Sequence, residues 1–255
     1  MPGGPQAILL PGSVLPAGLA YGALVEALGD EADARPKELE VYANDVPPAG
    51  YSLELEIEGV LREAEAAGLE RFHLVGYSGG GAAALALAAR RPNRLLSLAL
   101  LEPAWIGWSG MGPEEHAVWE TFDALVSADP DELMPAFVRF QLRPGVEPPP
   151  PPEGPPPPWM ASRPAGIRAF ANVFRTGDID HEALRQFRRP VYYALGGRSN
   201  PVLYERAAMR LERLFLDFTL EIFRERHHFD PPHRIEPERL AASLLEHWHR
   251  AEESS

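Results

Sequence analysis

A serine placed between glycines is the feature of this sequence that most directly suggests chemistry. Ser78 lies in the run Gly76-Tyr77-Ser78-Gly79-Gly80, after a short apolar stretch and before small residues that favour a helix. A tight turn from strand to helix points its serine outward, and flanking glycines remove the collisions that side chains would cause there. We therefore predict that Ser78 is a nucleophile. The alternative is a plain turn between a strand and a helix.

A serine hydroxyl needs partners before it can act as a nucleophile. It reacts poorly at neutral pH and requires a base within hydrogen-bond reach, normally a histidine that a carboxylate orients. Glu102 ends the apolar run 95–101, and a loop at 224–236 contains His227, His228 and His233. We expect these groups to meet Ser78 at one edge of the fold.

The elements that must position these groups alternate between strand and helix. Apolar stretches at 7–10, 39–43, 72–75, 95–101, 190–195 and 216–223 predict strands. Segments 19–28, 53–67, 79–90 and 202–214 predict helices, the second with Ser52 as its N-cap, and a last helix is expected from Pro237. This alternation predicts an α/β fold with a doubly wound, mostly parallel sheet of about six strands. In such a sheet, catalytic groups gather at the carboxyl ends of the strands.

Several motifs resemble those of the α/β-hydrolase family, and the resemblance covers nearly the whole chain. They are Leu9-Leu10-Pro11-Gly12-Ser13, the run around Ser78, the segment 190–198, and His228-Phe229 with Glu236-Pro237-Glu238. The resemblance implies Ser78 as nucleophile, His228 as general base and then general acid, and the backbone N–H groups of Ser13 and Gly79 as the oxyanion hole. Because the family usually has two further strands before the first motif, it also implies an α/β-hydrolase fold that lacks the first two strands.

The third member of a catalytic triad is less clear from the sequence. The loop that commonly supplies the acid in this family, 196–201, contains no carboxylate. Some branches of the family place the acid at the end of the strand after the nucleophile helix, which here is Glu102. We therefore expect Glu102 to orient the histidine. Asn200 or Ser199, Asp178 and Asp230 are the alternatives, and Glu102 could instead cap nearby N–H groups.

The choice of base follows from the resemblance, since His228 precedes Phe229 as in the family's histidine loop. The neighbouring His227 and His233 are expected to be solvated loop residues. His73 lies inside a predicted strand and is expected to be a core histidine bonded to a neighbour.

Strand and helix stop alternating between 104 and 187, where the chain is rich in aromatic residues. We expect a hydrolase core at 1–103 and 188–255 and a helical cap or lid insertion at 104–187, with a proline-rich loop at 144–158 in extended conformation. The proline-rich loop is expected to be a stiff surface loop, and a binding motif for proline-recognising domains is the alternative. We predict that Tyr77, Trp105, Trp108 and Trp159 contact the substrate, with Trp119, Phe122 and Phe137 as further candidates for the pocket wall. The cap aromatics could equally form the core of the insertion.

Composition excludes several classes of function. The chain has 255 residues, no cysteine and a formal net charge of −13, which disfavours nucleic acid and anionic membranes as partners and rules out thiolate chemistry. No apolar run is long enough to span a membrane, and the first residues do not read as a secretory signal, so a cytoplasmic protein is expected. We expect no metal and no cofactor, since no phosphate-loop or metal-ligand spacing is present. The oligomeric state is left open.

The sequence therefore predicts a serine hydrolase for a small, mostly apolar ester or related acyl substrate, acting through a Ser-His-Glu triad and an acyl-enzyme. Two alternatives remain at this level. The same triad could perform carbon–carbon bond hydrolysis or cofactor-free peroxide chemistry, or the fold could bind a small ligand without catalysis.

Overall fold

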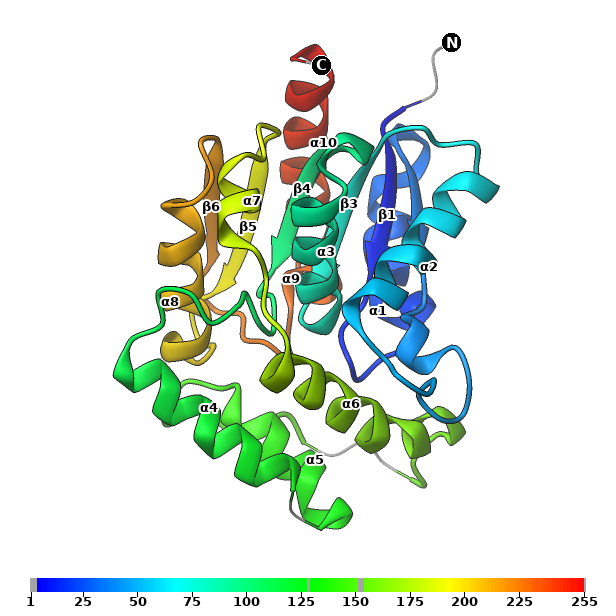
Figure 1. Cartoon of the computed structure of the whole chain (residues 1–255). Coiled ribbons are helices and arrows are strands. Elements are labelled where there is room, and N and C mark those ends of the chain that lie inside the picture. Colours follow the sequence, from blue (N-terminus) through cyan, green and yellow to red (C-terminus); the bar gives the residue numbers. More distant parts are fainter. Residues whose placement is uncertain (1–3, 128, 151–153, 255) are drawn as a thin grey trace.

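Six parallel strands form the sheet at the centre of the molecule. The computed structural model describes residues 4–127, 129–150 and 154–254. The strand order is β2-β1-β3-β4-β5-β6, with every neighbouring pair parallel. The strands are β1 Gln6–Leu10, β2 Asp33–Pro36, β3 Phe72–Tyr77, β4 Leu95–Leu101, β5 Val191–Gly196 and β6 Phe218–Phe223. The predicted class of fold, an α/β protein with a parallel sheet of about six strands, is confirmed (Figure 1).

Alternate residues of the strands pack against two different layers of helices. Leu9, Val75 and Leu101 join the apolar cluster on the face covered by α1 (Ala17–Leu28) and α10 (Pro237–Glu253). Their neighbours Leu10, Leu74 and Leu100 belong to the larger cluster with α2 (Leu53–Ala66), α3 (Gly79–Arg90) and α8 (Pro201–Glu212). Because side chains alternate across a strand, burial on both faces requires the continuous apolar runs seen in β3 and β4.

The segment between β4 and β5 carries the helices that face the carboxyl end of the sheet. These are α4 Pro113–Val126, α5 Pro130–Phe140 and α6 Arg163–Thr176, whereas the short α7 His181–Arg185 of the same segment packs against α3. In Figure 1, α4, α5 and α6 lie across the end at which the strands finish, below the nucleophile turn between β3 and α3. Residues 151–153 of the predicted proline-rich loop lie outside the described residues, and Pro158–Ser162 forms a short 3-10 helix.

One predicted strand is wrong. The apolar alternation at 39–43 belongs to a 3-10 helix at Glu40–Tyr42, whereas β2 is the polar segment Asp33–Pro36. The buried carboxylate of Glu56 accepts hydrogen bonds from the backbone N–H groups of Glu40 (2.9 Å) and Val41 (3.0 Å). These donors are therefore satisfied by a side chain and not by a neighbouring strand. The edge strand β2 buries little surface, so it carries no apolar signal.

Helix boundaries agree with the sequence to within a few residues, with one difference at a cap. Ser52 occupies the N-cap position of α2, but its side chain makes no capping hydrogen bond. A short helix, α9 (Pro232–Ile235), also forms in the histidine loop, where none is predicted. In the described part of the chain, no helix has both the length and the apolar character needed to cross a bilayer.

Candidate active site

Ser78 stands at the sharp turn between β3 and α3. Its backbone has φ 52° and ψ −117°, in the left-handed region that side chains other than glycine rarely adopt. A Cβ on Gly76 would lie 2.5 Å from the carbonyl oxygen of Gly80, and a Cβ on Gly80 would lie 2.5 Å from those of Leu10 and Pro11. The glycines of the motif are therefore required by close backbone approach on both sides of the serine.

A chain of two hydrogen bonds connects Ser78 to Glu102 through His228. The Nε2 atom of His228 lies 3.0 Å from Ser78 Oγ, and its Nδ1 atom lies 3.0 Å from Glu102 Oε2. All three side chains are buried, with 4%, 1% and 4% of the surface of Ser78, His228 and Glu102 exposed. The structure thus brings together groups that are 126 and 150 residues apart in sequence.

The partners of His228 define which ring nitrogen carries the proton. The carboxylate of Glu102 can only accept hydrogen bonds, so Nδ1 donates to it. Nε2 is then free to accept a hydrogen bond from the Ser78 hydroxyl, as a base requires. The second oxygen of Glu102 accepts a hydrogen bond from the backbone N–H of Gly196 at 2.8 Å, which fixes the plane of the carboxylate.

Two tyrosine rings hold the imidazole of His228. The Tyr204 ring is stacked on it, with centroids 4.6 Å apart and planes 13° apart, and the Tyr77 ring lies 4.9 Å away. The Tyr77 hydroxyl donates a hydrogen bond to the backbone carbonyl of His228. Burial raises the pKa of both tyrosines well above its usual value, with a further contribution from the charge of Glu102, so both hydroxyls remain donors. No sequence signal marked Tyr204, which lies on α8 and meets His228 only in the folded chain.

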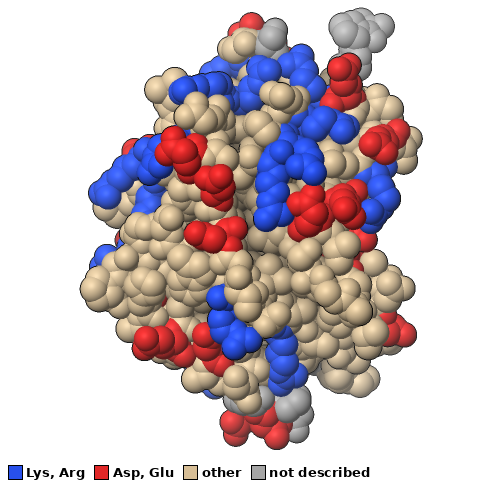
Figure 2. Space-filling view, in the orientation of Figure 1, with Lys and Arg blue, Asp and Glu red and all other residues tan. Residues whose placement is uncertain are grey.

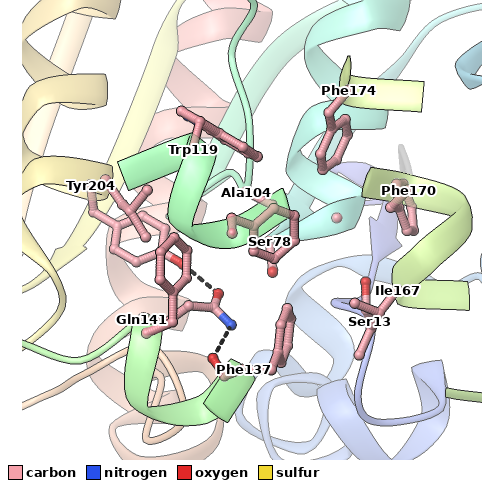
Figure 3. Close-up of a pocket in the computed structure, with 14 residues that line it drawn as sticks. Ser13, Ser78, Ala104, Trp119, Phe137, Gln141, Ile167, Phe170, Phe174 and Tyr204 are labelled. Carbon is pink, nitrogen blue, oxygen red and sulfur yellow. Dashed lines mark hydrogen bonds between the residues drawn. The ribbon is translucent and has the colours of Figure 1, made fainter. Parts of the chain in front are cut away.

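The side chain of Ser78 lines a pocket at the carboxyl end of the sheet. The pocket has an empty volume of about 430 Å³, including its opening to solvent. Its wall is mostly apolar and comes largely from the insertion helices and α8: Ser13, Ser78, Gly79, Ala104, Trp119, Phe122, Phe137, Phe140, Gln141, Ile167, Phe170, Phe174, Leu203 and Tyr204. Figure 3 shows Ser78 between Gln141 and Tyr204 on one side and Ile167 and Phe170 on the other.

The predicted substrate contacts Tyr77, Trp105, Trp108 and Trp159 are not among the residues that line this pocket, whereas the further candidates Trp119, Phe122 and Phe137 are. Tyr77 packs behind His228, away from the lining. Trp105 is 2% exposed and stacks on Phe174, with ring centroids 5.0 Å apart, so it belongs to the core under the insertion. Trp108 donates its indole N–H to the carbonyl of Phe174 at 2.8 Å. Trp159 lies near the guanidinium of Arg163.

Ser13 and Gly79 both line the pocket beside Ser78. Gly79 is the first residue of α3, and the amide at that position has no acceptor within the helix. Ser13 lies in the loop after β1, and the backbone N–H of Gly80 donates to Pro11 in that loop at 3.0 Å. Two backbone segments that could stabilise an oxyanion are thus held next to the serine hydroxyl.

Within the described residues, none of the other candidates for the acid is hydrogen-bonded to His228. The Asn200 side chain caps α8 by accepting from Val202 N at 3.1 Å, and its amide donates to the carbonyl of Phe140. Asp178 accepts hydrogen bonds from the backbone of Trp108 and Ile179, and Asp230 is paired with Arg226. Ser199 is buried, and its hydroxyl makes no hydrogen bond among the described residues.

The expectation that His227 and His233 are solvated is wrong. They are 8% and 0% exposed, and His233 packs against the rings of Tyr77 and Tyr21. Burial lowers the pKa of His233 to about 3, so its ring is neutral near pH 7. The prediction for His73 agrees with the structure: its ring is fully buried and hydrogen-bonded to Ser97 Oγ at 2.9 Å. Within the described ranges, no cluster of three histidine or carboxylate side chains is arranged to hold a metal.

Charged residues are distributed unevenly over the face drawn in Figure 2. Side chains of both signs crowd the upper half of this face, a band across its middle carries few charges, and further charged side chains of both signs lie below that band, at the level of the insertion helices.

The sequence comparisons find one family model and several relatives that match part of the chain. A family model described as alpha/beta hydrolase fold matches residues 57–148. A protein named "Putative carbamate hydrolase RutD" from Caulobacter segnis is 33% identical over 96 residues, which cover 38% of this chain and 33% of that protein. The protein of the same name from Klebsiella pneumoniae subsp. pneumoniae is 35% identical over 81 residues, covering 32% of this chain and 29% of that protein. The chain thus spans about a third or less of the curated relatives it matches.

Solved structures resemble the chain over almost its full length. A hydrolase from Pseudomonas aeruginosa has a TM-score of 0.69 at 21% identity, covering 96% of this chain and 89% of that one. An esterase from Exiguobacterium antarcticum has a TM-score of 0.71 at 18% identity, covering 97% and 93%. At these identities the likeness concerns the fold. By its parallel sheet, its matching segment and its structural neighbours, the chain has the α/β-hydrolase fold.

Proposed function

We propose that this protein is a serine hydrolase that cleaves a small, mostly apolar ester or related acyl compound through an acyl-enzyme. The observation that carries the proposal is the hydrogen-bond chain from Glu102 through His228 to Ser78, at the wall of a mostly apolar pocket. In this proposal the three residues form a catalytic triad, and the protein acts without a cofactor.

The first half of the reaction forms a bond between Ser78 Oγ and the acyl carbon. His228 Nε2 takes the hydroxyl proton as the oxygen attacks, and the carboxylate of Glu102 stabilises the imidazolium. The carbonyl oxygen becomes negatively charged and receives hydrogen bonds from the backbone N–H groups of Gly79 and Ser13. The imidazolium then gives its proton to the leaving oxygen, and the alcohol departs.

The second half returns the enzyme to its starting state. A water molecule takes the place of the alcohol and gives a proton to His228 Nε2 as it attacks the acyl-enzyme. The same amides hold the second oxyanion. The bond to Ser78 Oγ breaks, its oxygen recovers the proton from His228, and the carboxylic acid leaves.

The lining of the pocket supports an uncharged, largely apolar substrate. Ten of its residues are apolar, and neither a positive nor a negative side chain is among them. Burying a charged group in such a site without a partner would be costly. Carbamates belong to the same class of acyl compounds, and the curated relatives are named for them, so carbamate esters are included among the expected substrates.

We also propose that 104–187 acts as a cap over the core formed by 1–103 and 188–255. The supporting observation is that α5 and α6 contribute much of the pocket wall above Ser78, including Phe137, Ile167 and Phe170. In this role the insertion determines the shape of the substrate and excludes water, while the sheet carries the reacting groups.

The proposal predicts that a fluorophosphonate probe labels Ser78 and no other serine, as located by mass spectrometry of the intact and digested protein. Ser78→Ala should abolish labelling and lower kcat/KM for p-nitrophenyl acetate by at least about 10⁴-fold. Ser109→Ala changes an exposed serine away from the pocket and serves as the matched control. A folded protein that stays unlabelled, or a Ser78→Ala variant that keeps its turnover, would refute the proposed hydrolase.

A further inference from the structure

One residue of the pocket wall carries polar atoms that the proposed reaction does not use. Gln141 follows α5 and is 4% exposed. Apart from Ser13, Ser78, Tyr204 and the indole N–H of Trp119, it is the only residue of the lining with polar side-chain atoms. Figure 3 shows its amide reaching into the cavity between the sides formed by Tyr204 and Phe137.

The hydrogen bonds of Gln141 define the orientation of its amide. The side chain lies 3.1 Å from the backbone carbonyl of Phe137 and 2.6 Å from the hydroxyl of Tyr204. A carbonyl oxygen can only accept, so the atom facing Phe137 is the nitrogen, and Oε1 accepts from Tyr204. The Tyr204 ring is in turn stacked on His228.

This arrangement leaves one amide hydrogen of Gln141 without a partner. The Nε2 atom has two N–H bonds, and among the described residues only the carbonyl of Phe137 accepts one of them. A buried donor without an acceptor is destabilising, and the aromatic and aliphatic groups around it offer none. The pocket therefore contains a donor suited to an acceptor supplied from outside the protein.

The structural contacts at this position do not use the second N–H of the Gln141 side chain. The backbone of Gln141 already joins the end of α5 to the start of α8, because its carbonyl accepts from the N–H of Asn200 at 2.9 Å. The same junction is strengthened by the Asn200 side chain, which donates to the carbonyl of Phe140 at 2.8 Å. The Oε1 atom of Gln141 pairs the buried Tyr204 hydroxyl, but neither that bond nor the junction uses the second N–H of Nε2.

We propose that Gln141 is a specificity-determining residue whose free N–H donates a hydrogen bond to a second oxygen of the substrate, outside the scissile carbonyl. The substrate class is therefore an uncharged acyl compound that carries an ether or carbonyl oxygen in its acyl or alcohol part, in preference to a purely aliphatic ester. The inference depends on the proposed function in one respect, namely that the pocket at Ser78 is the substrate site.

Binding to the Ser78→Ala protein tests this without requiring catalysis. Two pairs of probes each differ by one CH₂ replaced by oxygen: the 4-nitroanilides of butyric and methoxyacetic acid, and butyl acetate with 2-methoxyethyl acetate. In at least one pair, isothermal titration calorimetry should show a preference for the oxygen-containing member. Replacing Gln141 by Met, which has a similar shape but no donor, should reduce that preference by about tenfold, as expected for one lost hydrogen bond.

Two further variants make the result specific. Gln186→Met introduces the same change at an exposed glutamine outside the pocket and should keep the preference. Tyr204→Phe keeps the ring beside His228 but removes the hydroxyl that orients the amide, so it should reduce the preference by less than Gln141→Met. If both pairs bind with ratios within twofold in the presence of Gln141, or if Gln141→Met leaves the ratios unchanged, the inference is wrong.

The same ligands separate this inference from the proposed hydrolase. Suppose that the wild-type protein does not hydrolyse 2-methoxyethyl acetate, but its Ser78→Ala variant binds the probes with the Gln141-dependent preference. That result would overturn the proposed function alone. Hydrolysis of both acetates by way of Ser78 with no Gln141-dependent preference would overturn the assignment of Gln141 alone.

Discussion

At the level of single residues, the strained backbone is concentrated at two members of the proposed triad. Among the described residues, Ser78 and Glu102 are the only ones other than glycine with a positive φ, at 52° and 46°. Each such conformation costs on the order of 1–3 kcal/mol, so the surrounding contacts must hold it. Glu102 is held by Gly196 and His228, and the backbone N–H of Ser78 donates to Leu101 at 3.2 Å. Both strained residues direct their side chains toward the same imidazole.

Replacing Glu102 by Gln should lower kcat/KM by about 10³–10⁴-fold while leaving the fold intact. An amide is similar in shape but carries no charge to stabilise the imidazolium, and its NH₂ group can face Nδ1 and favour the wrong tautomer. The measurement is turnover of p-nitrophenyl acetate together with the rate of fluorophosphonate labelling.

Glu56→Gln is the matched control for this prediction. Glu56 is also a buried carboxylate, fully buried beneath the 3-10 helix at Glu40–Tyr42 and remote from His228 in its contacts. The Glu56→Gln substitution should affect the free energy of unfolding more than turnover, because the carboxylate oxygens of Glu56 accept hydrogen bonds from backbone N–H groups. Unchanged turnover in Glu102→Gln would reject the assignment of the acid.

At the level of elements, close packing of the turn at Ser78 on the loop after β1 brings the proposed oxyanion donors together. The backbone N–H of Gly80 donates to the carbonyl of Pro11, and a Cβ on Gly12 would lie 2.7 Å from the Tyr77 ring. The start of α3 can therefore approach β1 only because these positions lack side chains. A change in either loop should move the amides of Ser13 and Gly79 relative to Ser78.

Gly80→Ala should lower both the free energy of unfolding, by about 1–3 kcal/mol, and kcat/KM. The added methyl group would lie 2.5 Å from two backbone carbonyl oxygens, so the two loops must separate. Gly22→Ala is the control: this exposed glycine inside α1 has open space around it, and alanine there should raise the free energy of unfolding by about 0.5–1 kcal/mol. Urea denaturation measures the free energy of unfolding of both variants, and ester turnover measures kcat/KM. Equal stability of Gly80→Ala and Gly22→Ala would contradict the close approach.

At the level of the whole molecule, several histidines are buried in neutral form and link stability to pH. Burial lowers the pKa of His73 and His233 to about 3 and that of His247 to about 4. Because the unfolded chain binds a proton at each of these rings near pH 6.5, the stability that the neutral rings contribute is complete above that pH. It is lost as the pH falls from 6.5 toward 3. The fold should therefore be sensitive to mild acid.

His233→Phe should make the protein less sensitive to acid. The phenyl ring can keep the contacts with Tyr21 and Tyr77 but takes up no proton on unfolding. Between pH 7 and pH 5, the decrease in the free energy of unfolding should be about 2 kcal/mol smaller in the variant, as obtained from urea denaturation at each pH. Above pH 7.5 the two stability curves should run parallel, which is the internal control. Equal decreases in both proteins would show that His233 is not buried in neutral form.

Much of the fold could be predicted because local rules determine it. The sharp turn at Ser78 is visible in the sequence because backbone clashes allow only glycine at Gly76 and Gly80. β4 is visible because a strand buried on both faces must be continuously apolar. Edge strand β2 satisfies neither condition. The 3-10 helix at Glu40–Tyr42 is apolar and buried like a strand, but its backbone N–H groups donate to Glu56 and not to a neighbouring strand.

The sequence alone determined the strand ends at which Ser78, Glu102 and the histidine loop lie, since the periodicity of burial and the steric needs of tight turns are local properties of the chain. Only the tertiary structure decided which side chains meet there. It stacked Tyr204 on His228, buried His227 and His233, and made Gln141 part of the pocket wall while leaving Trp105, Trp108 and Trp159 outside it. These contacts join segments far apart in sequence, and their geometry depends on how whole helices pack over the sheet, which no local pattern of residues encodes.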